Sequence, residues 1–100
     1  GFVIENIIAV CPPNTNCYFY RTAQGAEIDL IIEVAHNNLW AIEIKKSSSP
    51  TITQGFHIAC NDIKASRKFV VYSGDESFSM GNEITAIPLK EMMRLVMKLN

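Results

Sequence analysis

Long hydrophobic runs and a strong net charge are both missing from this sequence. A membrane-spanning helix needs about 18 or more consecutive apolar residues, and the most apolar stretch, residues 26–34, is interrupted by Glu27, Asp29 and Glu33. Nine Lys and Arg against ten Asp and Glu leave a net charge of −1, so no overall field attracts nucleic acid or an anionic membrane. We therefore expect a soluble domain without membrane contact, in which a local patch would bind any nucleic acid.

Cysteine is scarce, and its spacing carries no signature. Cys11, Cys17 and Cys60 are odd in number and form no CxxC pair, so neither a zinc site nor a disulfide framework is indicated. The chain does not open with a basic segment, an apolar stretch and a small-residue cleavage site, so nothing suggests export. Reduced, packed thiols in the cytoplasm are the expectation, and a Cys11–Cys17 disulfide is the alternative.

Glycine and proline together number only nine, and 48% of the 100 residues are hydrophobic. Such a composition favours a folded chain over a disordered one, and this length allows one domain with a modest core. Residues 1–100 are therefore expected to form a single domain. Residues 1–10 predict a helix without a capping residue, as if the domain had been cut from a longer polypeptide.

Periodicity and turn residues predict a mixed α/β fold. The first helix should end before the two prolines at 12–13, and Thr51 or Thr53 is available to cap the second. The other expected elements are three strands, a helix, a strand, a short edge strand and a helix, over residues 17–22, 26–34, 39–45, 51–63, 68–73, 84–87 and 89–99. The order α-β-β-β-α-β-β-α indicates a mixed sheet with helices on its faces.

The second and third predicted strands form a hairpin that carries charges at informative positions. Strict alternation divides the first of them into two faces, Ile28, Leu30, Ile32 and Val34 against Glu27, Asp29, Ile31 and Glu33. Glu43 and Lys45 share one face of the other strand, because their spacing equals the side-chain period. Three charged groups therefore converge on the hairpin.

The expected register brings the two acids close together. A turn centred on Asn37 pairs Asp29 directly with Lys45. In the same register Ile31 faces Glu43, so Glu43 lies diagonally from Asp29, at roughly 7–8 Å between Cα atoms.

Two carboxylates at this separation can share one divalent cation. Mg²⁺ (or Mn²⁺) takes oxygen ligands, and Asp29, Glu43, a backbone carbonyl such as that of Ile44 and several waters would supply them. Lys45 would then stand beside a metal-bound water, where its ammonium orients that water or stabilises charge on a phosphate. The alternative is a cross-strand ion-pair ladder on a solvated surface, worth roughly 0.2–1 kcal/mol per pair.

Asp29, thirteen intervening residues and Glu43-Ile44-Lys45 resemble the D…ExK signature of the PD-(D/E)XK nuclease superfamily. The predicted α-β-β-β-α-β order is similar to the core of that superfamily. The resemblance implies a restriction-endonuclease-like fold and a metal-dependent nuclease that cuts DNA. Ile28 stands where the superfamily has its proline, a position that varies in such domains.

Two helical residues extend this resemblance. Glu5, on the first helix, is similar to the acidic residue that often completes the superfamily's site; an exposed helix residue is the alternative. Gln54 stands where some members, such as the nuclease domain of bacterial recombination helicases, carry a glutamine. The alternative for Gln54 is a surface residue of the first helical turn.

A narrower resemblance covers roughly residues 1–89. Residues 1–6, 18–22, 25–30 and 41–45 resemble the uncharacterised domain found C-terminal to many prokaryotic AAA+-type ATPases. This resemblance implies an N-terminal ATPase part outside the chain, because the sequence contains no GxxxxGK[ST] phosphate-binding loop.

Basic and apolar surface residues suggest partners. The candidate nucleic-acid contacts near Lys45 are Lys46, Gln54, Lys64, Arg67 and Lys68. Ordinary solubilising charges are the alternative. The side of the last helix with Met92, Met93 and Met97 is a candidate contact with the ATPase part or with a second copy, as a homodimer.

Two functions follow as hypotheses. In the first, Asp29 and Glu43 hold Mg²⁺, Glu5 assists, and Lys45 positions the water that attacks a phosphodiester in DNA. In the second, the chain is a catalytically inactive, nuclease-like accessory or protein-interaction module of its ATPase. The sequence leaves open whether the chain is an enzyme.

Overall fold

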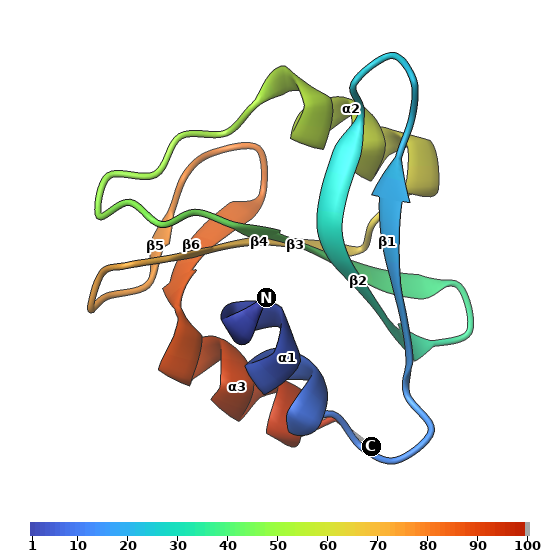
Figure 1. The fold of residues 1–100 in the computed structure, drawn as a ribbon, viewed down its shortest axis with the longest axis vertical. Helices are drawn as coiled ribbons and strands as arrows, with labels where there is room; N and C mark the ends of the chain where they lie inside the picture. Colours follow the sequence, from blue (N-terminus) through green and yellow to red (C-terminus); the bar gives the residue numbers. More distant parts are fainter. Residues whose placement is uncertain (100) are drawn as a thin grey trace.

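The computed structural model describes residues 1–99 and has a mixed sheet between two layers of helices (Figure 1). In chain order the elements are α1 (Phe2–Ala9), β1 (Asn16–Arg21), β2 (Glu27–Ala35), β3 (Asn38–Ile44), α2 (Gln54–Ile63), β4 (Arg67–Tyr72), β5 (Phe78–Ser79), β6 (Ile84–Pro88) and α3 (Leu89–Met97). The mixed α/β class expected from the sequence is confirmed. The two-residue strand β5 is too short to carry a periodicity, so the sequence does not predict it.

Six strands form one sheet in the order β1-β2-β3-β4-β6-β5. β1, β2 and β3 pair antiparallel, β3, β4 and β6 pair parallel, and β5 pairs antiparallel with β6. The prediction of an edge strand over 84–87 is wrong, because β6 lies between β4 and β5 and is largely buried. The carboxyl ends of β3, β4 and β6 therefore meet at one end of the sheet.

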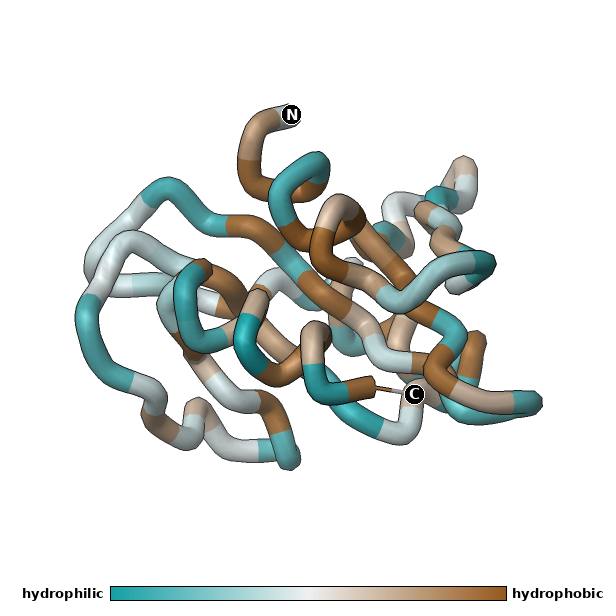
Figure 2. Tube along the Cα trace, turned by 90° about the horizontal axis from the view of Figure 1, so that it is seen from below, coloured by the Kyte–Doolittle hydropathy of each residue, from teal (hydrophilic) through white to brown (hydrophobic). Residues whose placement is uncertain are grey.

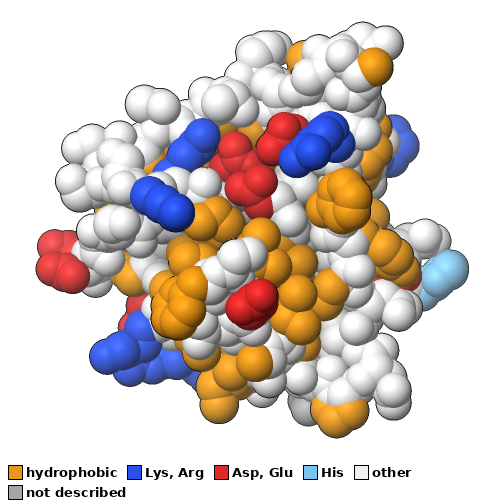
Figure 3. Space-filling view, viewed as in Figure 1, with side chains coloured by type: hydrophobic (Ala, Val, Ile, Leu, Met, Phe, Trp, Pro, Cys, Tyr) orange, Lys and Arg blue, Asp and Glu red, His pale blue; other side chains and the backbone are white. Residues whose placement is uncertain are grey.

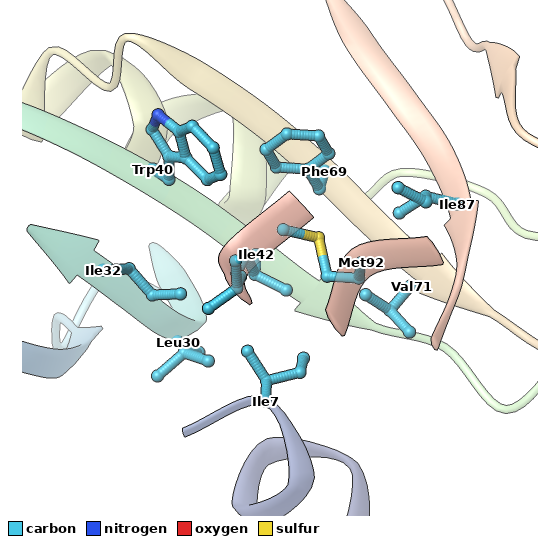
Figure 4. Packing of buried hydrophobic residues seen from close by; sticks show 10 residues of the cluster. Ile7, Leu30, Ile32, Trp40, Ile42, Phe69, Val71, Ile87 and Met92 are labelled. Carbon is cyan, nitrogen blue, oxygen red and sulfur yellow. The ribbon is translucent and has the colours of Figure 1, made fainter. Parts of the chain in front are cut away.

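Helices α1 and α3 lie side by side on one face of the sheet, the α1/α3 face, and α2 covers the opposite α2 face (Figure 1). The core of the α1/α3 face contains Ile7, Leu30, Ile32, Trp40, Ile42, Phe69, Val71, Ile87, Met92 and Val96 (Figure 4). The core of the α2 face contains Ala26, Ile28, Ile31, Ala41, Phe56, Ala59, Cys60, Val70 and Ile84. Hydrophobic residues accordingly follow the strands, whereas hydrophilic residues gather in several outer loops (Figure 2).

The methionine side of α3 is only partly available to a partner. Met92 is fully buried in the core of the α1/α3 face, so its predicted place on a docking surface is wrong. The 3.6-residue helical period turns Met92 inward together with Val96. Met97 remains 63% exposed and Met93 is half-buried.

A β-bulge in β2 changes the predicted division of its faces. Tyr18 of β1 pairs with Ile31 and Tyr20 pairs with Ile28, so Phe19 stands against two residues of β2, Asp29 and Leu30. The extra residue reverses the alternation. Ile28 therefore packs with Ile31 on the α2 face, and the prediction that Ile28 shares a face with Leu30 is wrong.

The register of the β2–β3 hairpin also differs from the prediction. Ile31 pairs with Ala41, whereas a turn centred on Asn37 pairs it with Glu43. The pairing register shifts between Glu33 and Ala35. A prediction that extends one register from the turn along both strands does not contain such a shift. The error is two residues, so Glu43 stays on the predicted face of its strand.

All three cysteines lie in the described part of the chain and are free thiols, so the alternative Cys11–Cys17 disulfide is not formed. Burial raises the pKa of the Cys60 thiol to about 11, and burial together with the neighbouring Cys17 raises that of Cys11 to about 11. Among the helices of residues 1–99, none is long and apolar enough to cross a membrane.

A close backbone contact fixes the start of α2 against the β1–β2 turn. The Thr53 hydroxyl caps the helix by accepting a hydrogen bond from the Phe56 N–H at 3.2 Å, so α2 begins at Gln54 rather than at residue 51. A Cβ atom at Gly55 would lie 2.3 Å from the Gly25 carbonyl oxygen. Gly55 therefore allows α2 to approach the turn that precedes β2.

The Gly55 contact predicts whether replacing this glycine raises or lowers the free energy of unfolding. Helix propensity favours Ala over Gly by about 1 kcal/mol, but Gly55→Ala would push a methyl group into backbone. We expect Gly55→Ala to lower the free energy of unfolding by about 1–3 kcal/mol, measured by urea denaturation. Gly1→Ala, with no neighbour within 4 Å of its Cβ, is the control and should change it little. A stabilised Gly55→Ala variant would show that the contact does not constrain α2.

Candidate active site

The structure brings three of the predicted site residues together. Asp29 lies in the bulge of β2, Glu43 is the penultimate residue of β3, and Lys45 follows that strand directly. The β2–β3 ladder ends at the Leu30–Ile42 pair, and Asp29 and Glu43 are the next residues beyond it on their strands. They lie close enough for the charge of Asp29 to raise the pKa of Glu43. On the face seen in Figure 3, acidic side chains lie between Lys or Arg side chains.

One oxygen of Asp29 binds the backbone of β3. The Ile44 N–H donates to Asp29 Oδ2 at 2.9 Å, and the next N–H, that of Lys45, donates to the Val71 carbonyl on β4 at 2.9 Å. In a regular antiparallel ladder a β2 carbonyl would accept the Ile44 N–H. At the bulge the Asp29 carboxylate takes that role, which fixes its position beside β3.

Glu43 is the one buried charged residue among those described, with 8% of its surface exposed. Its Oε2 atom lies 3.5 Å from Lys45 Nζ. Its Oε1 atom is buried and has no hydrogen-bond partner within residues 1–99. Leaving a buried acceptor unpaired costs roughly 1–3 kcal/mol, more when it is charged, so this oxygen requires an explanation.

The surroundings of Glu43 change its protonation. Burial, followed by the nearby negative charge of Asp29, raises the pKa of Glu43 from 4.5 to about 7, and the Lys45 ammonium opposes this rise only in part. A cation between the two carboxylates would favour the ionised form. Above about pH 7, where Glu43 is ionised as well as Asp29, the site has one more negative charge than Lys45 offsets.

The donor set fits a hard divalent cation. Carboxylate oxygens of Asp29 and Glu43 are ligands that Mg²⁺ and Mn²⁺ prefer, and the unpaired Glu43 Oε1 is a ready acceptor. Ile44 lies at the site through its N–H contact with Asp29. Water would have to supply the remaining ligands, which is usual for Mg²⁺.

Glu5 is not part of this group. It lies on α1 with an exposed side chain, and in the described part of the chain no three His, Cys, Asp or Glu residues come close enough to hold a metal ion together. The turn of α1 that faces the core presents Ile7, which leaves Glu5 on the solvent side. Glu5 therefore lies where the alternative interpretation, an exposed helix residue, places it.

Three of the predicted nucleic-acid contacts lie on two segments. Lys46 is exposed two residues after the end of β3. Gln54 is exposed at the start of α2, and Lys64 follows its last residue in a left-handed conformation at φ 55°. Gln54 and Lys64 therefore lie at opposite ends of α2.

Arg67 and Lys68 lie at the amino end of β4. Arg67 pairs with Trp40, near the start of β3, and its guanidinium lies 5.0 Å from the centre of that ring. Lys68 pairs with Ala41, on the strand face of Glu43, and its ammonium donates to the Asn82 carbonyl at 3.4 Å. Arg67 is therefore occupied at the far end of β3, whereas Lys68 is two strand positions from Glu43.

A pocket of about 490 Å³ adjoins the site and includes a residue that the sequence did not indicate. Lys45 and Lys46 form part of its lining, and so does Lys90, in the first turn of α3. The available signal was the place of Lys90 directly after a strand, since ligands of open sheets bind at the carboxyl ends of parallel strands. Using that signal required knowing that β6 is parallel to β3 and lies near it.

Residues 1–92 match a protein family described as a domain of unknown function, DUF4143. The chain belongs to this family. Uncharacterised proteins of Mycobacterium bovis and Mycobacterium tuberculosis are each 33% identical to the chain over 93 residues. That match covers 93% of the chain and 21% of each relative, so the chain spans about a fifth of their length. No solved structure matches the chain.

The raised pKa of Glu43 predicts how the stability of this DUF4143 domain changes with pH. From about pH 4.5 to about pH 7 the folded chain keeps a proton on Glu43 that the unfolded chain releases, so the free energy of unfolding should fall as pH rises through this window. We expect Glu43→Gln to remove that fall and to stabilise the chain by about 1–3 kcal/mol near pH 8.

Urea denaturation near pH 5 and near pH 8, without divalent metal, measures this effect. Glu76→Gln, at an exposed carboxylate in the loop after β4, is the control and should keep the pH dependence of the wild type. If the free energy of unfolding changed with pH in the same way for the wild type and Glu43→Gln, the raised pKa of Glu43 would be contradicted.

Proposed function

We propose that this domain is a metal-dependent phosphodiesterase that cuts DNA. The observation that carries the proposal is the buried Glu43 carboxylate, with one unpaired oxygen, beside Asp29 and 3.5 Å from the Lys45 ammonium. The resemblance of Asp29 and Glu43-Ile44-Lys45 to the PD-(D/E)XK signature supports it and suggests a restriction-endonuclease-like fold. An ion-pair ladder on a solvated surface explains the site less well, because Glu43 is buried.

Each residue has a distinct role in this proposal. Asp29 and Glu43 hold Mg²⁺ or Mn²⁺, with the Ile44 carbonyl as a further ligand, and the Ile44 N–H keeps the Asp29 carboxylate in place. The bound cation would lower the pKa of a water molecule and offset charge on the phosphate. The Lys45 ammonium donates a hydrogen bond to the attacking water and stabilises charge on the phosphate oxygens.

An ATPase part of the same polypeptide is the proposed partner. The resemblance to domains found C-terminal to AAA+-type ATPases suggests it, and the length of the mycobacterial relatives, of which the chain covers 21%, leaves room for it. Such a pairing would place nucleotide hydrolysis and DNA cleavage in one protein, in the cytoplasm.

An exposed hydrophobic surface favours a second candidate, the inactive interaction module. Phe2 and Phe19 are 74% and 72% exposed, and Ile8 and Tyr18 are also exposed. Ile8, Tyr18 and Phe19 line a groove of about 540 Å³ between α1 and β1. Hydrophobic side chains cover much of the centre of the face in Figure 3. Such a surface fits contact with the ATPase part or with a second copy.

Cleavage of plasmid or single-stranded DNA with Mg²⁺ or Mn²⁺ tests the nuclease. We expect Asp29→Asn and Lys45→Ala each to lower the cleavage rate by about 100-fold or more, because the first removes a metal ligand and the second the group that orients water. Glu33→Gln, which changes a carboxylate at the far end of β2, should retain activity. Cleavage that survives both substitutions would refute the assignment.

Calorimetric titration with Mn²⁺ separates the two candidate functions. The nuclease predicts heat of binding at millimolar metal for the wild type and none for Asp29→Asn, since two carboxylates are needed to hold the ion. The same titration with DNA present tests whether the metal binds only when DNA supplies a further ligand. No heat under either condition would favour the inactive module.

A further inference from the structure

The pocket of about 490 Å³ lies at the carboxyl ends of the three parallel strands. Its walls are residues 44–46 at the carboxyl end of β3, 71–75 at that of β4 and 88–91 at that of β6, with Val3 of α1. The volume lies in the range of small-molecule sites, about 300–1,000 Å³. In open sheets of this kind, this end is where ligands bind.

Charge on the walls favours an anion. Lys45, Lys46 and Lys90 line the pocket together with Asp75 and Glu91. Lys45 is paired with Glu43, and Glu91 is paired with Arg94. Within residues 1–99, Lys46 and Lys90 make no salt bridge, so two cations remain against one acid, Asp75.

The two free lysines line the pocket from different segments. Lys46 follows β3 and Lys90 follows β6, and β4 lies between these strands. A phosphate group in the pocket could therefore be approached by both ammonium groups.

Apolar side chains in the lining could contact the sugar or base of a nucleotide. The partly buried side chains of Val3, Ile44 and Leu89 line it beside the lysines. A surface of this kind suits a sugar or a base, because it buries apolar area without an unpaired polar group. A nucleotide combines such a group with a phosphate.

Ile44 and Lys45 belong both to this pocket and to the carboxylate site. We propose that the pocket holds the nucleotide adjacent to the cleaved phosphodiester, with its phosphate at Lys46 and Lys90 and its sugar on Val3, Ile44 and Leu89. This inference rests on the proposed nuclease function and names Lys90 as a residue that positions the strand.

The test measures binding of a labelled single-stranded DNA oligonucleotide to the 100-residue chain carrying Asp29→Asn, which prevents cleavage. Adding Lys46→Ala and Lys90→Ala should weaken binding by about 10-fold and lower the slope of log K against log salt by about 0.7, the value for one phosphate contact on a single strand. Lys46→Arg with Lys90→Arg should restore binding, because charge is kept.

Arg21→Ala with Lys98→Ala removes the same charge from exposed positions outside the pocket and is the matched control. If both double variants weakened oligonucleotide binding equally, the inference would be overturned. If the wild type still cut DNA in that case, the proposed nuclease function would stand without it. If the wild type neither binds nor cuts DNA, the proposed function fails and this inference fails with it.

Titration with thymidine 5′-monophosphate distinguishes a strand from a free nucleotide. Weak binding of the mononucleotide, together with tight binding of the oligonucleotide that depends on Lys46 and Lys90, supports the strand. Mononucleotide binding that depends on these lysines, with oligonucleotide binding that does not, would overturn the assignment to a strand.

Discussion

One extra residue in β2 links the packing of the sheet to the geometry of the site. Because Phe19 stands against both Asp29 and Leu30, the strand reverses its alternation at this point. Ile28 and Ile31 can then both pack under α2, while Leu30 fills the core under α1 and α3. The same irregularity brings the Asp29 carboxylate to the Ile44 N–H. A regular β2 would lose both arrangements together.

The position of β3 inside the sheet explains why Glu43 is an unfavourable residue for stability. Glu43 has β2 on one side and Val70 of β4 on the other, and α2 covers the face of Ala41. Water therefore has little access to its carboxylate, whose charged form loses solvation. The two hydrophobic cores on either side of the sheet offset that cost. Retaining an unpaired acceptor at such a place fits a binding site better than a structural role.

The sequence predicted most of the helices and strands and the residues that meet at the candidate site, but not the contacts between them. The position of Asp29 in an apolar strand and the spacing of Glu43 and Lys45 follow from the period of two, and the shift of two residues in register preserves that face. The bulge was not predictable, because its signal is a pairing with Phe19 on another strand. The choice between the two interpretations of Glu5 could not be made from the sequence for a similar reason, since the direction of an α1 side chain depends on how the helix docks on the sheet.

The topology of the parallel strands accounts for the pocket beside the site. Parallel neighbours need connections that return to the opposite end of the sheet, so the chain leaves β3, β4 and β6 at the same end. The segments that leave carry Lys46, Ser73 and Lys90 respectively. Positions 44 residues apart thus face one space beside the carboxylates, although neither lysine is near the other in sequence. In the proposed nuclease, basic residues at the exits of the parallel strands are therefore the ones available to hold a phosphate beside the carboxylate site.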